Sequence, residues 1–348
     1  MTFEEITEAD FRDFAEKSPY KSFMQTPEIA KYRAENGWTA YYLAAKQGGE
    51  IKAASMLVAR PTFLGKSTFI APGGPLLDLE DEPLTAYFLK NLKKYIRAHN
   101  GYVLQISPYY ELTERDRHGD PIENGFNHQA AVKNLKNLGF TEQKNASQPK
   151  YMYALDLNGK SPEELMQDFK SNTRGHIRKA EKMGVTVREL KREELGIFKQ
   201  ITESTSTRRH FEDKPLSYYE AMYDLFAPRN EVLFLLAEAD SVPLSAAMFM
   251  LYGSEVVYLF SGSDEKYMKD YNAQYALQWH IIKYASEHKY KRYNFYGIHG
   301  LPSKDQNDGV YEFKKGFGGQ VLEYIGTWEL PVDQKFYQLK QFLRKFKK

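Results

Sequence analysis

Apolar and polar positions follow the same order of patterns in two stretches that start about 190 residues apart. Residues 41–109 predict three strands, a helix over residues 84–99 and a fourth strand. Residues 231–298 predict the same series, with the helix over residues 273–288. Both helices are indicated by apolar residues three and four positions apart, namely Leu84, Phe88, Leu92, Tyr95 and Ile96, and Tyr275, Leu277, Ile281, Ile282 and Ala285. The chain therefore carries an internal repeat of the order β-β-β-α-β.

This repeat predicts an α/β (mixed α+β) protein of two domains. Short strands joined by turns, followed by a strand that comes after a helix, predict mixed sheets flanked by helices. A chain of 348 residues also exceeds what one hydrophobic core usually organises. We assign residues 1–149 together with 326–348 to the first domain and residues 150–325 to the second. The order of elements resembles that of acetyltransferase-like (GNAT) domains, an analogy of fold that leaves the chemistry open.

Composition excludes several kinds of chemistry. The chain has no cysteine, so disulfides, thiolate zinc sites and cysteine nucleophiles are absent. It has no GxSxG, HExxH, Walker A or GxGxxG motif and no histidine spacing that suits a metal, so we expect neither a metal nor a cofactor. A net charge of +2 means that a nucleic-acid partner would have to meet a local basic patch. The N-terminus is acidic and no long apolar run follows, which predicts a cytoplasmic protein.

A basic helix is predicted after residues 161–164, which form a capping box with proline at the first helical position. Five basic residues then fall within 13 positions with a single glutamate, and most recur every four residues, which places them on one face. The five are Lys170, Arg174, Arg178, Lys179 and Lys182. A solvated charged face is the common explanation of such a run, but the scarcity of acidic partners favours polyphosphate or RNA.

Two further segments place basic residues beside aromatic ones. Lys214 precedes Tyr218 and Tyr219 on a helix predicted to begin after Pro215. Lys314 and Lys315 lie between Phe313 and Phe317, ahead of a Gly-Gly turn. A lysine framed by aromatic side chains can stabilise a developing negative charge, act as a base if its pKa falls, or merely extend its ammonium group to solvent.

The C-terminal residues 335–348 predict an amphipathic helix. Its apolar face is formed by Phe336, Leu339, Phe342 and Leu343. We expect this face to dock on a domain, with a contact to an anionic membrane surface as the alternative.

These segments together resemble the FemABX family of peptidyltransferases, which build the interpeptide bridges of peptidoglycan from aminoacyl-tRNA. The resemblance spans nearly the whole chain and rests on SNTRGHIRKAEKMGV, SGSDEKYMKDYNAQYALQWHIIKYA and YEFKKGFGG, in that order. It implies two tandem GNAT-like domains. Many relatives insert a coiled-coil arm in the second domain, but here LLAEADSVPLSAAM passes between two strands through a tight turn. The chain therefore resembles the shorter members without the arm.

The resemblance also implies roles for particular residues. Lys314, with Phe313 beside it, matches the FK pair whose lysine stabilises the oxyanion. Basic and aromatic positions that bind the muropeptide match Lys31, Lys214 and Tyr218, with Phe260 in the same group. Relatives often have an aspartate where this chain has Ser107, and serine is no useful base toward an ammonium, so the general base is unassigned. The basic helix and the lysine-rich C-terminus are the candidates for tRNA.

The resulting functional hypothesis is aminolysis of an aminoacyl-tRNA ester by an amine of a peptidoglycan precursor. The partners would be aminoacyl-tRNA and either UDP-MurNAc-pentapeptide or lipid II, and the protein would act as a monomer without a cofactor. Two other hypotheses remain open: an acyl-CoA-dependent GNAT-type N-acyltransferase, and a non-catalytic module that binds RNA or anions. Neither helix start that would cradle the CoA pyrophosphate, in DLEDEPLT and EKYMKDYNAQ, has the closely spaced glycines of that class.

Overall fold

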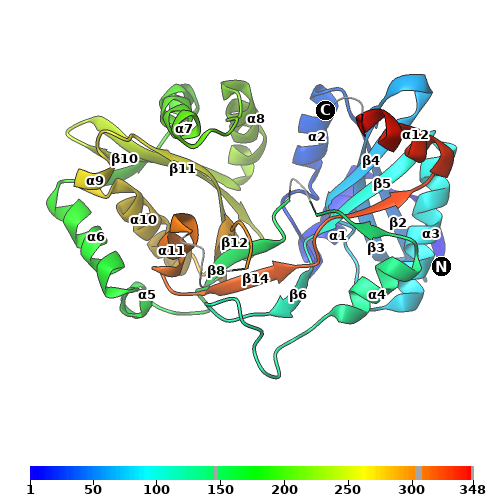
Figure 1. The fold of residues 1–348 in the computed structure, drawn as a ribbon, viewed down its shortest axis with the longest axis horizontal. Coiled ribbons are helices and arrows are strands. Elements are labelled where there is room, and N and C mark those ends of the chain that lie inside the picture. Colours follow the sequence, from blue (N-terminus) through cyan, green and yellow to red (C-terminus); the bar gives the residue numbers. More distant parts are fainter. Residues whose placement is uncertain (145–147, 302–307, 346–348) are drawn as a thin grey trace. The chain divides into compact units, whose positions relative to one another are not determined.

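The computed structural model describes residues 1–144, 148–301 and 308–345, and the chain divides into two compact units (Figure 1). Unit 1 comprises Met1–Glu114, Glu123–Lys150 and Glu323–Lys348, and unit 2 comprises Arg115–Ile122 and Tyr151–Leu322. Each unit contains one copy of the repeat. In the described part of the chain, no helix is both long and apolar enough to cross a bilayer.

Unit 1 is built on a seven-stranded sheet whose neighbours are antiparallel except for one parallel pair, β4 and β5. The parallel pair arises because α3 (Glu82–Ala98) connects these two strands. In spatial order the strands are β1 (Thr2–Glu5), β2 (Thr39–Gln47), β3 (Glu50–Pro61), β4 (Ser67–Gly73), β5 (Gly101–Pro108), β15 (Trp328–Pro331) and β7 (Thr141–Glu142).

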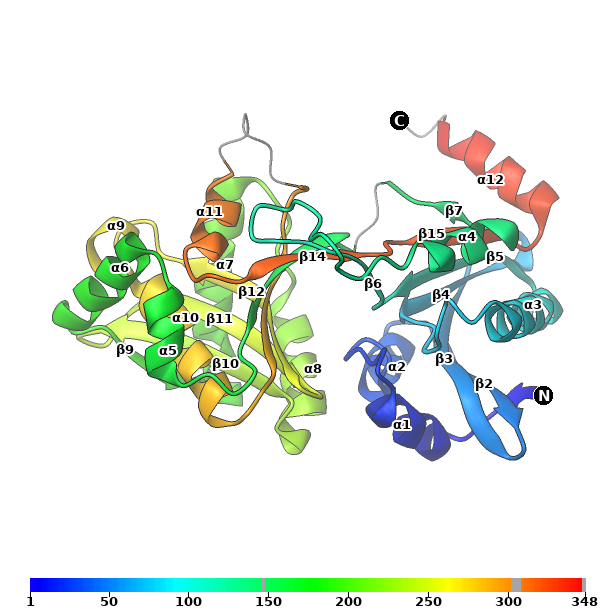
Figure 2. The same ribbon diagram turned by 90° about the horizontal axis from the view of Figure 1, so that it is seen from below.

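Helices cover both faces of this sheet. Figure 2 shows α2 and α3 on opposite sides of it, and α3 presents Phe88, Leu92 and Ile96 to the core with no exposed surface. Leu84 and Tyr95 pack at the edge of the same core, so the predicted apolar face of this helix is confirmed. The remaining elements are α1 (Glu8–Lys17), α2 (Pro27–Glu35), the turn η1 (Phe63–Gly65), β6 (Glu111–Glu114), α4 (Gln129–Asn137) and α12 (Gln334–Lys345).

Unit 2 repeats this plan. From β8 to β9 its neighbouring strands again pair antiparallel, except for the two that α10 (Ala273–Glu287) connects, β12 and β13. In spatial order they are β14 (Gln320–Tyr324), β8 (Tyr151–Asp156), β13 (Arg292–Gly297), β12 (Glu255–Ser263), β11 (Val242–Tyr252), β10 (Val232–Ala239) and β9 (Thr186–Glu189).

In unit 2 also, helices lie on both faces of the sheet (Figure 1). The core side of α10 consists of Leu277, Ile281, Ile282 and Ala285, all buried, with Tyr275 partly buried beside them, as the spacing predicts. The other elements are α5 (Pro162–Asp168), α6 (Ser171–Lys182), η2 (Arg192–Glu194), α7 (Leu195–Arg209), α8 (Leu216–Phe226), η3 (Ala227–Arg229), α9 (Met268–Tyr271) and α11 (Gly309–Lys315).

The structure confirms the mixed α/β class and the absence of an inserted arm. Strands β10 and β11 pair as far as Ala239 and Val242, so only Asp240 and Ser241 form the turn. Both have positive φ, 48° and 62°, the backbone that a two-residue hairpin requires.

Two expectations for helices need correction. The predicted basic helix is divided, because α5 ends at Asp168 and α6 begins at Ser171 with Lys170 as its N-cap, so Lys170 precedes the helical face. In α12, Phe336 alone of the four predicted apolar residues is buried, at 8% exposure; Leu339, Phe342 and Leu343 are 42%, 57% and 41% exposed. Residues 346–348 of the predicted helix lie outside the described residues.

A Gly-Gly turn directs the chain from α11 into β14. Gly318 and Gly319 both have positive φ, 81° and 86°. A Cβ on Gly319 would lie 2.1 Å from the carbonyl oxygen of Ala154, on the neighbouring strand β8. The close approach of the two backbones therefore requires glycine at this position.

We expect Gly319→Ala to lower the free energy of unfolding by about 3 kcal/mol or more, because it adds a backbone clash to the cost of positive φ. Gly159→Ala is the matched control: Gly159 has φ 81° and nothing within 4 Å of a Cβ. The control should lose only about 1 kcal/mol. Urea unfolding of the two variants measures the difference, and equal losses would contradict the steric argument.

Candidate functional site

The side chain of Lys314 is buried in unit 2. The residue lies in the last turn of α11 and is 5% exposed. Its Nζ donates hydrogen bonds to the carbonyl oxygens of Tyr296, at 3.2 Å, and Gly297, at 2.5 Å. Burial lowers the pKa of Lys314 to about 7, although nearby Asp308 opposes the shift. Near neutral pH this lysine can therefore act as a cationic hydrogen-bond donor or as a neutral amine.

A bulge at the end of β13 turns these carbonyls toward Lys314. The pairing of β13 with β8 is irregular between Asn294 and Gly297, and Tyr296 has φ 65° within this interval. Positive φ is unusual for an aromatic residue and costs free energy. The fully buried Asn294 holds the bulge, because its side-chain oxygen accepts a hydrogen bond from the Tyr296 N–H at 2.7 Å.

Two aromatic side chains of the predicted site lie near this bulge. Strands β12 and β13 pair in parallel from Glu255 to Val257, and each continues past the last paired residue. Phe260 lies on this continuation of β12, and its ring is 5.6 Å from the ring of Tyr218 on α8. Burial and the neighbouring Tyr218 raise the pKa of Tyr296 on β13. Unit 2 thus brings the predicted residues Tyr218 and Phe260 close to the bulge that binds Lys314.

Lys214 belongs to the same group of residues, and its backbone is held by Asp213, a residue that the sequence analysis did not identify. Its Nζ lies 5.9 Å from the centroid of the Tyr218 ring, and its backbone N–H donates to Oδ1 of Asp213 at 2.9 Å. Asp213 also accepts hydrogen bonds from Lys199, Thr202 and the hydroxyl of Tyr219. Asp213 lies inside the polar segment RRHFEDK and carries no motif, so only its contacts identify it.

These contacts determine the ionisation of Asp213. Burial alone would raise its pKa, but hydrogen bonds from Lys199, Tyr219 and Thr202 outweigh burial and lower the pKa. The buried carboxylate therefore fixes the segment that carries Lys214 and the start of α8.

Phe313 orients α11. Its ring lies 5.0 Å from Tyr275 and 5.4 Å from Phe317, at the edge of the core of unit 2. At the same C-terminal half of the helix, Lys170 forms an ion pair with Glu312 at 3.0 Å, and its backbone N–H donates to the carbonyl of Gly316. The helix that carries Lys314 is therefore connected to the N-terminus of α6.

The basic residues predicted to bind tRNA divide into two groups on α6. Lys170 is paired with Glu312, and the guanidinium of Arg174 donates to the carbonyls of Gln167 and Phe169 at the end of α5. The acidic partner of Lys170 comes from a distant segment, which the local sequence could not show. Arg178, Lys179 and Lys182 are exposed along the rest of the helix.

Lys31 and Ser107 belong to unit 1. Lys31 is exposed on α2. Ser107 is half-buried near the end of β5, and its Oγ lies 3.0 Å from the hydroxyl of Thr327. They therefore belong to a different unit from Lys214, Tyr218, Phe260 and Lys314.

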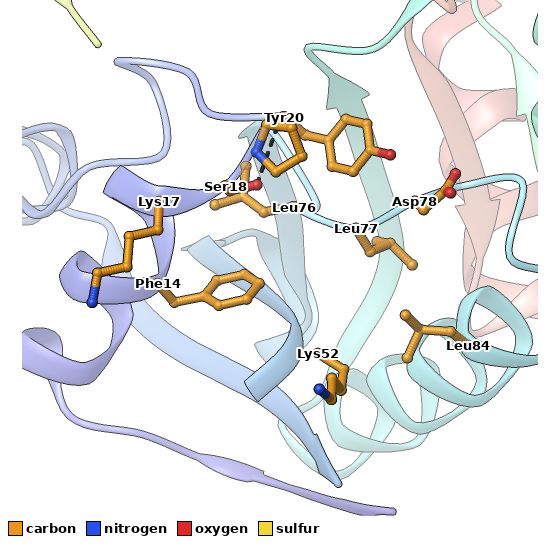
Figure 3. A pocket seen from close by; sticks show the side chains of 10 residues that line it. Phe14, Lys17, Ser18, Tyr20, Lys52, Leu76, Leu77, Asp78 and Leu84 are labelled. Atoms are coloured by element: carbon orange, nitrogen blue, oxygen red, sulfur yellow. Dashed lines mark hydrogen bonds between the residues drawn. The ribbon is translucent and has the colours of Figure 1, made fainter. Parts of the chain in front are cut away.

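Unit 1 also contains a cavity of about 270 Å³, between α1, β3 and the start of α3 (Figure 3). Its walls are mostly apolar, with Phe14, Leu76, Leu77 and Leu84 among them, and none of the predicted site residues lines it. The two lysines at its rim already have acidic partners, since Lys17 pairs with Asp13 and Lys52 with Glu50. The cavity therefore offers no unpaired lysine to an anionic ligand, and Asp78 in its wall accepts a hydrogen bond from the hydroxyl of Tyr110.

The two copies of one mixed fold define a tandem GNAT-like protein. A tandem GNAT protein from the clavulanic acid biosynthesis pathway is similar in structure, with a TM-score of 0.56 at 11% identity. The match covers 95% of this chain and 98% of that protein's chain. The crystal structure of FemX matches 97% of this chain and 99% of its own, with a TM-score of 0.84 at 23% identity. These likenesses establish the fold.

Sequence comparison identifies the family. The sequence model of the FemAB family matches residues 6–241 and 237–345, so the chain belongs to the FemAB family. The two matched segments meet at the turn between β10 and β11. Aminoacyltransferase FemA of Staphylococcus epidermidis is 27% identical over 419 residues, with all of both chains covered. The protein is an aminoacyltransferase of this family.

We expect Asp213→Asn to lower the free energy of unfolding at pH 7 by about 2 kcal/mol, because charged hydrogen bonds to a buried group are lost. The pKa of Asp213 is lower in the folded protein, so its stabilisation is present above the unfolded pKa of about 3.9 and is lost as the pH falls through the folded value. The difference from wild type should thus shrink below about pH 4.

Asp224→Asn is the control, because Asp224 pairs with Arg192 at the surface and should contribute about 1 kcal/mol or less. Urea unfolding at several pH values measures both variants. A pH-independent loss at Asp213 would contradict the assigned ionisation.

Proposed function

We propose that the protein transfers an amino acid from aminoacyl-tRNA to an amine of a peptidoglycan precursor. Membership of the FemAB family supports the acyl transfer, and buried Lys314 on α11 is the observation that carries the proposed site. The acceptor would be a muropeptide linked to UDP or to lipid, and the amino acid would be of the alanine, serine or glycine class.

The reaction is aminolysis of an ester. The acceptor nitrogen attacks the ester carbonyl carbon, a C–N bond forms, and the carbonyl oxygen becomes an oxyanion. Collapse of this intermediate breaks the C–O bond to the terminal ribose, whose oxygen leaves with a proton, while the nitrogen loses one. The protein must therefore orient two anionic substrates and stabilise the oxyanion.

Lys314 suits the oxyanion role. Its ammonium is held away from bulk water, where a hydrogen bond to a developing charge is strongest. The two carbonyls that accept from Nζ fix the position of the group before substrate binds. Phe313 would act by packing, since it holds α11 against the core.

The position of α6 supports the tRNA proposal. Lys170 and Gly316 connect the N-terminus of α6 to α11, so the exposed cations Arg178, Lys179 and Lys182 lie on an element bound directly to the one that carries Lys314. An acceptor stem along α6 would bring its esterified end toward α11. Lys170 and Arg174 would contribute mainly by holding this arrangement.

We also propose precursor-binding roles for particular residues of each unit. We assign its diphosphate to Lys31 and Lys214, and its rings to Tyr218 and Phe260. Ser107 would contribute a hydroxyl at the end of β5. Lysine offers a point charge in place of the bidentate fork of arginine, so Lys214 would bind phosphate without a fixed orientation.

Acyl-CoA is a poorer donor for this chain. The helix that follows β4 has Asp81 as its N-cap and Glu82 in its first turn, which repel a pyrophosphate. The corresponding helix in unit 2, α10, starts at Asn272-Ala273-Gln274 without glycine.

Incubation of the purified protein with aminoacylated tRNA and UDP-MurNAc-pentapeptide or lipid II tests the proposal. A mass gain of one amino-acid residue on either acceptor is expected. A mass gain that occurs only with acetyl-CoA as the donor, or no mass gain with any donor, would reject the proposal.

We expect Lys314→Met to lower kcat about 100-fold or more while the muropeptide Kd changes only a few-fold, because methionine keeps the packing and removes the donor. Melting temperature serves as the control for misfolding, which would reduce stability and binding together. Near-normal kcat in a folded variant would exclude the oxyanion role.

The pH profile separates a charged donor from a base. Arginine stays protonated throughout, so the rate ratio of wild type to Lys314→Arg cancels the titration of the substrate amine. If the ammonium is the active form, this ratio falls as the pH rises through about 7, toward tenfold per unit. A ratio that rises with pH would assign Lys314 as the base.

We expect the double variant Arg178→Glu and Lys182→Glu to raise the KM for charged tRNA about tenfold or more and to make its salt dependence less steep, because phosphate contacts are lost. Lys90→Glu with Lys94→Glu is the matched control, an exposed pair of the same spacing on α3 of unit 1. Equal effects of the two double variants would make α6 an ordinary solvated helix.

A further inference from the structure

Exposed apolar side chains gather at one place in unit 1. Eleven large hydrophobic residues of the described chain are exposed, and five of them lie on α12 or on the adjacent turn η1. The five are Phe63, Leu64, Leu339, Phe342 and Leu343. We call this group the α12 patch. Such a concentration of apolar surface on a folded protein marks an interaction surface.

The α12 patch is one continuous surface built from two distant segments. The ring of Phe63 lies 5.1 Å from that of Phe336, and the ammonium of Lys340 lies 4.9 Å from the Phe63 ring. Figure 1 shows the β3–β4 connection beside α12. Lys335, Leu339, Phe342 and Leu343 are exposed on the helix, with the spacing i, i+4, i+7 and i+8, whereas Phe336 in the first turn is buried against the unit.

The backbone at Leu64 adds independent support. Leu64 has φ 57° and is 74% exposed. A bulky residue in the left-handed region costs free energy, and an exposed leucine in this turn gains no packing to offset the cost. Asparagine would suit both the backbone and the solvent better. The leucine at the tip of the turn is therefore explained by a contact outside the chain.

The charge around the α12 patch identifies the partner. Lys335 is exposed in the first turn of α12, Lys340 lies against Phe63, and Arg60 is exposed at the end of β3. Asp333, the neighbouring acid, is already paired with Lys66 at 2.8 Å. The sequence after Leu343 continues as RKFKK, without an acidic residue. Exposed leucine and phenylalanine bordered by lysines are typical of a helix that lies in the interface of an anionic bilayer.

We propose that the α12 patch binds the surface of an anionic lipid membrane. Leu64, Leu339, Phe342 and Leu343 enter the headgroup region while the lysines contact acidic lipid. The contact is peripheral and reversible, because one short helix and one turn bury little apolar surface. It stands independently of the proposed acyl transfer, and it favours a lipid-linked acceptor, a point that rests on the proposed function.

Co-sedimentation with vesicles tests this proposal without any substrate. We expect the purified chain to bind vesicles of phosphatidylcholine with 30% phosphatidylglycerol at 0.1 M NaCl, and to bind at least about tenfold more weakly to pure phosphatidylcholine or at 0.5 M NaCl. Leu339→Asp with Leu343→Asp should weaken binding about tenfold or more. Met183→Asp with Val242→Asp, at residues of similar exposure in unit 2, is the matched control and should leave binding unchanged.

Leu64→Asn distinguishes a membrane contact from a structural role. Asparagine tolerates positive φ, so the melting temperature should stay the same or rise while vesicle binding weakens about threefold. Absence of vesicle binding by the wild-type chain would overturn the proposal. So would a dimer in analytical ultracentrifugation that Leu339→Asp with Leu343→Asp dissociates, because the patch would then join two copies of the chain.

Discussion

The burial of one lysine ammonium sets the requirements that the surrounding part of unit 2 meets. An amine removed from water needs acceptors, and Lys314 finds them in two backbone carbonyls that an ordinary strand would direct into its ladder. The bulge at Tyr296 releases these carbonyls, Asn294 stabilises the bulge, and the packing of Phe313 holds the helix that delivers the lysine. The strained backbone of Tyr296 and the buried ammonium of Lys314 thus occur together, and the two carbonyls join them.

The same arrangement gives the site its chemical versatility. A lysine in water stays charged far above neutral pH, whereas Lys314 titrates near 7 because burial disfavours the ammonium. Small changes around it, such as the arrival of an oxyanion, would then shift its protonation strongly. The aromatic group of Tyr218 and Phe260 and the anchored Lys214 lie beside this centre, so one unit combines a group for charge stabilisation with groups suited to rings and phosphate.

Duplication of one fold has produced two units with different surfaces. In unit 1 the parallel strands β4 and β5 pair along their whole length, from Ser67 to Gly73, whereas in unit 2 the equivalent strands pair over three residues of β12. In unit 1 the longer pairing engages the backbone N–H and C=O groups of β4 and β5 in sheet hydrogen bonds. The proposed catalytic groups accordingly lie in unit 2, and unit 1 instead presents the α12 patch. The proposed division of labour thus accompanies a difference in strand pairing between the two copies.

Much of this protein could be read from local patterns. The repeat, the apolar faces of α3 and α10, the capping box at Ser161 and the armless turn after Ala239 follow from residue spacing and turn chemistry, which act over a few positions. The sequence also indicated Lys314 as a candidate site residue, because its aromatic neighbours are close to it in sequence. Its role in catalysis remains a proposal, as do those of the other site residues.

Contacts between distant segments could not be read in that way. The pairing of Lys170 with Glu312 joins residues 142 positions apart, and the donors around Asp213 and the carbonyls that hold Lys314 lie on other elements, 6 to 18 positions away. Spacing on a helix predicts which side chains share a face, but it does not predict what covers that face. For this reason the sequence suggested a docked C-terminal helix, whereas the fold buries Phe336 and leaves Leu339, Phe342 and Leu343 at the surface.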